Sequence, residues 1–252
     1  MISSPLDFGV VHAHGERSFG APIGIMLLDC TAPMIPGSVG NASTYTAPVK
    51  YRSIPDLTVE QILSSDASRH CDRVVQVARA LATDGAQVIT TNCGFTARYQ
   101  QAVQSAVDVP VLLSSLLLVP FLQSMLPTHR KLGIITASSP SVTPEFVADT
   151  GISWDTDRVR FAGLEDAPAF AEAYLTCTGQ ADIPAIHDEV VRAAEALVAQ
   201  DPAIGCLLLE CSELPPYSAA VQQSTRLPVF DFTSMIEFFV AGLRRTVFTG
   251  FV

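Results

Sequence analysis

Short apolar runs alternate along the chain with longer segments in which apolar residues recur every three or four positions. The short runs are rich in Val, Ile and Leu and predict buried strands at residues 23–28, 87–91, 109–113, 132–136, 159–161, 204–209 and 227–230. The longer segments predict helices at 59–63, 68–83, 95–106, 116–126, 143–149, 167–175, 183–200, 217–224 and 235–246. This alternation is typical of an α/β protein whose sheets are mainly parallel.

Two parts of the chain repeat the same pattern. Cys93 and Cys211 each follow an apolar strand segment and precede a helical segment, and they lie 118 residues apart. Pro110 and Pro228, each set between apolar residues of the next predicted strand, show the same spacing. The repeat predicts two similar parallel-sheet halves, flavodoxin-like or Rossmann-like, related by a pseudo-two-fold axis. Because ligands of open α/β sheets bind at the carboxyl ends of the strands, we expect the active site in the cleft between the halves.

A third pair of landmarks helps to place the two halves. Gly24 and Gly133 begin equivalent apolar strands and lie 109 residues apart, so the loops of the two halves differ by a few residues. We expect residues 1–120 to form the first half, completed by the C-terminal segment 227–252. Residues 121–226 are then expected to form the second half.

Residues 109–128 carry no charged side chain, and on length alone this stretch could span a bilayer. Pro110, Pro120 and Pro127 divide it. A buried strand followed by a buried helix explains the stretch better, since both faces of a parallel sheet are covered. We therefore expect no membrane segment.

Composition and charge exclude other classes of protein. Of the 252 residues, 48% are apolar and 16% are charged, which is the balance of a folded globular chain. Twenty-five acidic residues against 15 basic ones give a net charge of −10, which argues against nucleic acid as a partner. The first twenty residues lack the basic start and apolar run of a secretory signal, so the sequence predicts a cytoplasmic protein.

The six cysteines show neither disulfide nor zinc-site spacing, because no CxxC pair is present and the five histidines are scattered. We expect no metal and no disulfide framework. Cys30, Cys71, Cys177 and Cys206 have no counterpart in the other half and are expected to be inert thiols. By contrast, Cys93 and Cys211 occupy equivalent turns between a strand and a helix, where exposed N–H groups favour a thiolate. These two are the candidate catalytic residues.

Two thiols that face each other across a cleft suit the chemistry of carbon acids. One thiolate can remove a proton next to a carboxylate while the opposite thiol returns one, which inverts the carbon. The same thiolate can instead start a β-elimination. Both reactions need donors for the substrate carboxylate, and the side chains of Thr91, Asn92 and Ser212 are placed to supply them. No pyridoxal-phosphate lysine motif, GxGxxG or GxxxxGK[ST] run is present, so we expect no cofactor.

Four further residues have both a functional and a structural interpretation. Asn41 ends a loop rich in Gly and Pro after the first strand, which either covers the substrate or simply connects two elements. Thr136 and Ser138 follow the first strand of the second half and either bind a carboxylate or form an ordinary turn. Glu213 either tunes Cys211 or caps the helix that follows.

The cysteine motifs resemble those of the aspartate/glutamate racemase superfamily, whose members are cofactor-independent and have two similar α/β halves with a catalytic Cys from each. The run 210–213, Glu-Cys-Ser-Glu, is similar to the Cys-Thr-Glu form of the family, with Ser212 in place of Thr. The run 90–95, Thr-Thr-Asn-Cys-Gly-Phe, departs from the usual Cys-Asn-Thr, because its Asn precedes the Cys. The resemblance implies catalytic roles for Cys93 and Cys211.

Three segments look more like one branch of this superfamily, which includes the algal dimethylsulfoniopropionate lyases. They are residues 35–41, 93–95 and 214–217. That branch keeps both cysteines, whereas the arylmalonate decarboxylases lack the first. The presence of Cys93 therefore argues against decarboxylation.

The leading hypothesis is a racemase or epimerase that acts on a small carboxylate-bearing substrate through Cys93 and Cys211. The alternatives are a lyase that uses one of these cysteines as its base, and a two-lobed binding protein without catalysis. The sequence is compatible with a homo-oligomer. Gly94 and Phe95 supply backbone N–H groups and an apolar wall in place of side-chain donors, so we expect substrate contacts there that disfavour free aspartate and glutamate.

Overall fold

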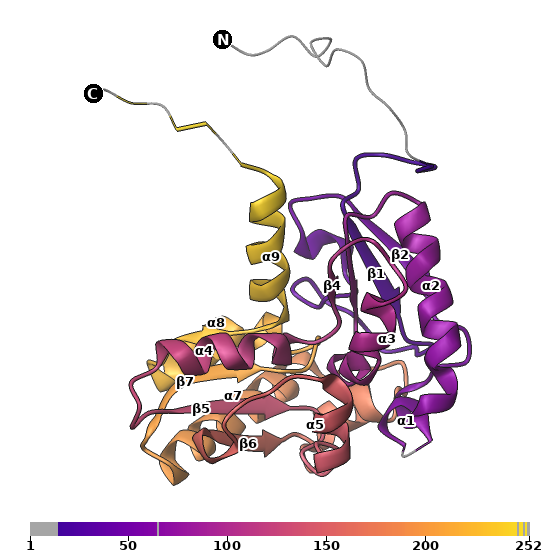
Figure 1. Cartoon of the computed structure of the whole chain (residues 1–252). Coiled ribbons are helices and arrows are strands. Elements are labelled where there is room, and N and C mark those ends of the chain that lie inside the picture. Colours follow the sequence, from indigo (N-terminus) through magenta and orange to yellow (C-terminus); the bar gives the residue numbers. More distant parts are fainter. Residues whose placement is uncertain (1–14, 65, 246, 249, 251–252) are drawn as a thin grey trace.

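The first half of the computed structural model is built on a four-stranded parallel sheet (Figure 1). The structure describes residues 15–64, 66–245, 247, 248 and 250. The strands of this sheet lie in the order β2-β1-β3-β4. Their bounds are β1 (Ile23–Leu27), β2 (Val49–Ser53), β3 (Val88–Thr91) and β4 (Val111–Leu112).

A second four-stranded parallel sheet repeats this arrangement with the order β6-β5-β7-β8. Its strands are β5 (Lys131–Thr136), β6 (Val159–Gly163), β7 (Ile204–Leu209) and β8 (Val229–Phe230). In each half the first strand lies between the second and the third. The predicted α/β fold with two similar parallel-sheet halves is confirmed.

Helices and short helical turns connect the strands. The α-helices are α1 (Val59–Leu63), α2 (Cys71–Thr83), α3 (Gln100–Gln104), α4 (Val119–Met125), α5 (Pro144–Thr150), α6 (Pro168–Phe170), α7 (Ile183–Gln200), α8 (Ser218–Thr225) and α9 (Phe232–Leu243). In four predicted helices, part of the segment is not α-helical. Three of them begin as the 3-10 helices η2 (Ala67–His70), η3 (Gly94–Tyr99) and η4 (Ser115–Leu118), and one ends as the π-helix η6 (Ala171–Leu175). The remaining 3-10 turns are η1 (Ala42–Thr44), η5 (Thr156–Arg158) and η7 (Pro215–Tyr217).

Strand β2 was not predicted by the hydrophobic pattern. It lies at the edge of the first sheet, where it pairs only with β1, and none of its side chains is fully buried. Lys50 and Arg52 interrupt its apolar residues. Charged side chains are common on edge strands because they discourage pairing with other chains, so such a strand needs no apolar run.

The described elements of the C-terminal segment 227–252, β8 and α9, belong to different halves. Strand β8 pairs with β7 in the second sheet, whereas α9 stands against the first sheet (Figure 1). Phe232 and Ile236 of α9 are fully buried in one apolar cluster with Ile23, Ile25 and Val88 of β1 and β3. Residues 1–14, which the sequence assigns to the first half as a prediction, and residue 246 of the last predicted helix lie outside the described residues.

The uncharged stretch 109–128 forms β4, η4 and α4, as expected for a buried strand followed by a helix. Across the described residues, no helix combines the length and the apolar character that crossing a membrane requires. A cytoplasmic location stays a prediction.

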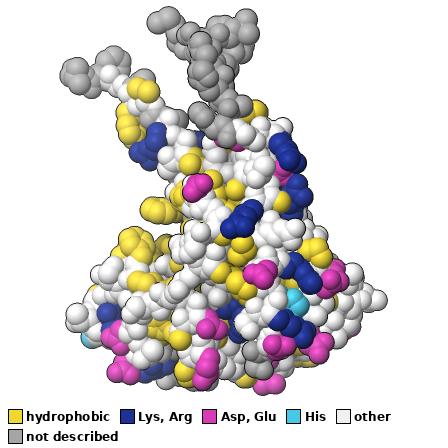
Figure 2. Space-filling view, turned by 45° about the vertical axis from the view of Figure 1, so that its right-hand side comes forward, with side chains coloured by type: hydrophobic (Ala, Val, Ile, Leu, Met, Phe, Trp, Pro, Cys, Tyr) yellow, Lys and Arg dark blue, Asp and Glu magenta, His cyan; other side chains and the backbone are white. Residues whose placement is uncertain are grey.

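A surface groove lies between α4 and α9, and hydrophobic side chains gather around it in the space-filling view (Figure 2). Phe121 and Phe238 line the groove and are largely exposed. On the face shown, Lys and Arg side chains are interspersed with Asp and Glu, so this face carries no continuous basic patch. The groove shares no lining residue with the cavity described next.

Candidate active site

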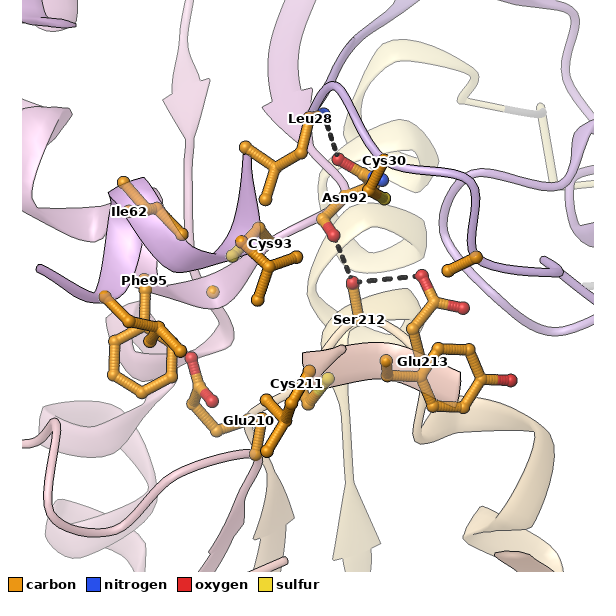
Figure 3. Close-up of a pocket in the computed structure, with 17 residues that line it drawn as sticks. Leu28, Cys30, Ile62, Asn92, Cys93, Phe95, Glu210, Cys211, Ser212 and Glu213 are labelled. Atoms are coloured by element: carbon orange, nitrogen blue, oxygen red, sulfur yellow. Dashed lines mark hydrogen bonds between the residues drawn. The ribbon is translucent and has the colours of Figure 1, made fainter. Parts of the chain in front are cut away.

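A cavity between the two halves collects residues from the carboxyl ends of β1, β3, β5 and β7 (Figure 3). This is where the duplicated fold was predicted to bind a ligand. The space inside it is small, about 40 Å³. The cavity is lined by Leu28, Cys30, Ala32, Val59, Ile62, Leu63, Asn92, Cys93, Gly94, Phe95, Ala137, Tyr174, Leu175, Glu210, Cys211, Ser212 and Glu213.

The turn after β3 presents the first thiol. Asn92 accepts a hydrogen bond from the backbone N–H of Leu28 through its side-chain Oδ1, at 2.8 Å, which ties this turn to the end of β1. Cys93 has extended backbone angles and occupies the N-cap position of η3. The backbone N–H groups of Phe95 and Thr96 lie near its sulfur and favour the thiolate, and the Thr96 N–H donates to the Cys93 carbonyl oxygen at 3.1 Å. Two donors at the start of a helical turn stabilise a thiolate.

Cys211 lies in the turn after β7 and comes from the opposite half. The next residue, Ser212, donates its hydroxyl hydrogen to the carbonyl oxygen of Asn92 (Figure 3). The backbone N–H of Val39 donates to the carbonyl oxygen of Ser212 at 3.1 Å. One direct hydrogen bond therefore joins the two cysteine turns, and a second ties the Cys211 turn to the loop that contains Val39. One backbone donor, the N–H of Glu213, faces the Cys211 sulfur.

Glu210 is a functional candidate that sequence reasoning missed. Its side chain is buried and lines the cavity. Thr136 donates to Oε2 at 2.8 Å, whereas Oε1 has no hydrogen-bond partner. Burial raises the pKa of this carboxyl to about 7. The available signal was a single charged residue at the end of an otherwise apolar strand.

Glu213 is the second buried carboxyl group of the cavity. Its Oε1 lies 3.4 Å from the Ser212 hydroxyl, and its Oε2 has no hydrogen-bond partner. Burial raises its pKa to about 7. Near neutral pH, both Glu210 and Glu213 therefore change readily between the neutral acid and the carboxylate.

The two thiols are poor acids in this environment. Burial raises the pKa of Cys93 to about 12, with a further contribution from the nearby carboxyl of Glu210. Burial also raises the pKa of Cys211 well above its usual value, and here both Glu210 and Glu213 add to the effect. Cys93 has two backbone donors and faces one of these carboxyl groups, so it is the more easily ionised of the pair.

The rest of the cavity wall is mainly apolar. Leu28, Ile62, Phe95 and Ala137 are buried aliphatic or aromatic side chains that face the same space as the thiols. None of the lining residues is Lys, Arg or His. The cavity therefore combines acidic groups and apolar walls without a basic side chain to neutralise a substrate anion.

Four of the predicted substrate-binding residues do not line the cavity. Asn41 donates to the carbonyl of Met34 at 2.8 Å and caps η1, so it stabilises its own loop. The hydroxyl of Thr91 is buried without a partner. Thr136 contacts Glu210, and the Ser138 hydroxyl lies 2.8 Å from that of Ser141.

The other predicted residues meet in the cavity, namely Asn92, Cys93, Gly94, Phe95, Cys211, Ser212 and Glu213. A third cysteine joins them. Cys30, which follows β1 and was expected to be inert, also lines the cavity, whereas Cys71, Cys177 and Cys206 do not. Among the residues that the structure describes, no three His, Cys, Asp or Glu side chains come together as metal ligands.

Glu210→Gln is expected to flatten the pH dependence of stability. The carboxyl pKa is about 7 in the folded state against 4.5 for the free side chain, so its stabilising neutral form is fully present below pH 4.5 and is lost as the pH rises through 7. This difference between the two pKa values corresponds to a loss of roughly 3 kcal/mol in the free energy of unfolding across that pH range. Gln stays neutral and can still accept from Thr136. Urea unfolding between pH 5 and 8 should show that the free energy of unfolding of the variant rises relative to that of the parent as the pH rises. If both proteins showed the same dependence of unfolding free energy on pH, the raised pKa of Glu210 would be contradicted.

Comparison with known proteins agrees with the geometry. The family model described as Asp/Glu/Hydantoin racemase matches residues 38–236. A dimethylsulfoniopropionate lyase of Durusdinium sp. clade D is 32% identical over 228 residues, covering 88% of this chain and 75% of that lyase. Dimethylsulfoniopropionate lyase 7 of Emiliania huxleyi strain CCMP1516 is 31% identical over 229 residues, covering 88% of this chain and 67% of that lyase.

A solved structure shows the same fold at lower identity. The glutamate racemase isoform RacE1 of Bacillus anthracis matches with a TM-score of 0.56 at 14% identity, covering 88% of this chain and 81% of the racemase. The resemblance that the two cysteine motifs indicated is confirmed, and the protein is a racemase-like or lyase-like enzyme. This chain belongs to the Asp/Glu/hydantoin racemase family.

Proposed function

We propose that this protein is a cysteine-dependent lyase that eliminates a sulfide from a small sulfonium carboxylate such as dimethylsulfoniopropionate. The observation that carries the proposal is a cavity with the thiols of Cys93 and Cys211 from opposite halves, a third thiol from Cys30, two buried carboxyl groups and apolar walls, but no basic side chain. The similarity to dimethylsulfoniopropionate lyases over 88% of the chain supports it.

A sulfonium group matches this cavity better than an ammonium group does. Sulfonium carries a permanent positive charge but no N–H or O–H donor, so its methyl groups can lie against Leu28, Ile62 and Phe95 without leaving a polar group unpaired. The unpaired carboxyl oxygens of Glu210 and Glu213 offer negative charge to the cation. An amino acid's ammonium would need several acceptors in the same apolar space.

In the proposed reaction, the Cys93 thiolate removes a proton from the carbon next to the substrate carboxylate. The electron pair of that C–H bond forms the carbon–carbon double bond, and the C–S bond breaks with its electrons passing to sulfur. Dimethyl sulfide leaves as a neutral molecule, acrylate remains, and Cys93 holds the proton. Developing charge on the carboxylate is stabilised by the Cys211 thiol and by the backbone N–H groups of the two turns.

The charge of the substrate explains how thiols that are protonated at neutral pH become active. A positive charge within about 4–6 Å of a thiol favours the thiolate and lowers its pKa. A sulfonium bound beside Glu210 would act on Cys93 in this way, since that carboxyl raises the thiol pKa when the charge is not offset. The substrate would therefore activate its own base.

Racemisation remains the second candidate, because thiols from opposite halves line one cavity. With one thiolate and one thiol, the enzyme could remove a proton from one face of the carbon and return one to the other. Here the substrate would be a chiral carbon acid, and both cysteines would be equally necessary.

The test is turnover of a substrate panel followed by proton NMR in deuterated water, with dimethyl sulfide measured in the headspace. We expect dimethyl sulfide and acrylate from dimethylsulfoniopropionate, and little reaction with aspartate or glutamate. Inversion or deuterium exchange of an amino acid or hydantoin, without sulfide release from the sulfonium carboxylate, would favour the racemase. Binding of these compounds without any turnover would favour the two-lobed binding protein.

A further inference from the structure

Two cysteines outside the proposed chemistry meet at the rim of the cavity, one from each half. Cys30 follows β1 in the first half, and Cys177 follows η6 in the second. Both line one surface cleft, and each side chain shifts the pKa of the other, so the two thiols are neighbours. The hydroxyl of Thr31 donates to the backbone carbonyl of Cys177 at 3.0 Å, which fixes the two segments side by side.

Both thiols can be reached from the surface. Cys30 and Cys177 are half-buried and line a shallow surface cleft together with Thr31, Thr58 and Leu175. Cys30 and Leu175 also line the cavity, so the pair lies where that cleft meets the cavity. A small oxidant that enters the cleft therefore contacts both sulfur atoms.

The local contacts also make Cys30 the more reactive of the two. The Cys177 thiol hydrogen is directed at the backbone carbonyl of Tyr174, at 3.7 Å. The neighbouring Cys177 side chain is the main cause that lowers the pKa of Cys30 to about 6, with a smaller contribution from the backbone N–H of Ala32 and against the opposing effects of burial and Asp29. The thiolate is the form that reacts with peroxides.

We propose that Cys30 and Cys177 form a reversible disulfide that links the two halves at the rim of the cavity. The Cys30 thiolate attacks a hydroperoxide, breaks its O–O bond and becomes a sulfenic acid, and with one proton the leaving oxygen departs as water or an alcohol. The Cys177 sulfur then attacks the sulfenic sulfur, the S–S bond forms, and the oxygen leaves as a second water. The two thiols lose two electrons and the peroxide gains them. A dithiol reductant reverses the change.

A disulfide between Cys30 and Cys177 would restrict the entrance to the cavity. The cavity space of about 40 Å³ holds only a few waters at roughly 10–15 Å³ each, so a carboxylate substrate needs the rim segments to separate. A disulfide between residues 30 and 177 would prevent that separation. This effect on turnover rests on the proposed function, whereas formation of the disulfide does not.

The test is peptide mapping of the full chain after treatment with hydrogen peroxide, without reduction. We expect a Cys30–Cys177 cross-linked peptide that disappears with dithiothreitol, and a higher unfolding temperature for the oxidised protein. In Cys177→Ser the cross-link and the temperature difference should vanish, while Cys71→Ser, altered at a thiol outside the cavity, should keep both. Circular dichroism of the reduced variants confirms that they fold.

A second measurement follows the thiolate without peroxide. At pH 7 we expect iodoacetamide to label Cys30 at least tenfold faster than Cys71, and Cys177→Ser to reduce that advantage. Equal labelling rates, or a peroxide-induced disulfide between Cys93 and Cys211 in place of the rim pair, would overturn the proposal. If peroxide also abolished turnover by the Cys177→Ser variant, which cannot form this disulfide, the loss of turnover would come from oxidation of the catalytic thiols. That result would contradict the Cys30–Cys177 disulfide as the cause of the lost turnover.

Discussion

Cys93→Ser is expected to reduce turnover of dimethylsulfoniopropionate by roughly 10³-fold, near the middle of the range for loss of a general base. A serine hydroxyl is a far weaker acid than a thiol, so the substrate's charge cannot convert it into a base. Cys211→Ser keeps a hydrogen-bond donor beside the carboxylate and should lose less than about tenfold. The two variants should lose unequal amounts of turnover because the elimination needs a base but no acid: a neutral sulfide leaves without taking up a proton.

The measurement is kcat for sulfide release by each variant, with Cys71→Ser as the control that should match the parent. Equal and large losses at Cys93 and Cys211 would indicate that both exchange protons with the substrate, as two-base racemisation requires. Undiminished turnover in Cys93→Ser would remove Cys93 as the base.

Gly94→Ala is expected to have the largest effect of any single methyl group added to the site. A Cβ at this position would lie 2.6 Å from the Glu210 carboxyl carbon and 2.9 Å from the Glu210 carbonyl oxygen, with the carboxyl oxygen closer still. Both the side chain and the backbone of Glu210 would have to move, and overpacking of this kind costs about 1–3 kcal/mol. Turnover should fall together with stability, because Glu210 directly precedes Cys211 and packs against Gly94, the residue after Cys93.

Gly242→Ala is the matched control, since a Cβ there meets no atom within 4 Å and the residue lies within α9. Ala in a helix interior is favoured over Gly by up to about 1 kcal/mol, so this variant should be as stable as the parent or more stable. The double variant Gly94→Ala/Glu210→Ala should recover part of the stability, because only the carbonyl contact remains. If urea unfolding shows that Gly94→Ala is as stable as Gly242→Ala, the close packing of Gly94 against Glu210 is contradicted.

The duplicated fold could be predicted because repeated landmarks depend on sequence alone. Cys93 and Cys211 lie at equivalent strand ends, and the shared strand order of the two sheets brings those ends to one cavity. Strand β2 could not be predicted in the same way, since an edge strand carrying Lys50 and Arg52 has no continuous apolar run.

The remainder of the site depends on contacts between distant segments. Glu210 is an ordinary acidic residue in the sequence and becomes a cavity carboxyl only because Gly94 and Thr136 pack around it. Thr136 was expected to offer its hydroxyl to a substrate, but that hydroxyl donates to Glu210. Cys30 has no counterpart in the second half, so the repeat that identified the other two cysteines gave no signal for it.

The packing of α9 on the first sheet has a consequence for how the protein is made. Ile23, Ile25 and Val88 leave the ribosome well before Phe232 and Ile236, which cover them and lie more than 140 residues later in the chain. At about 5–20 residues per second, one apolar face of that sheet stays uncovered for on the order of ten seconds. A nascent chain in this state offers a binding surface to chaperones, and chains that terminate before α9 would be prone to aggregate.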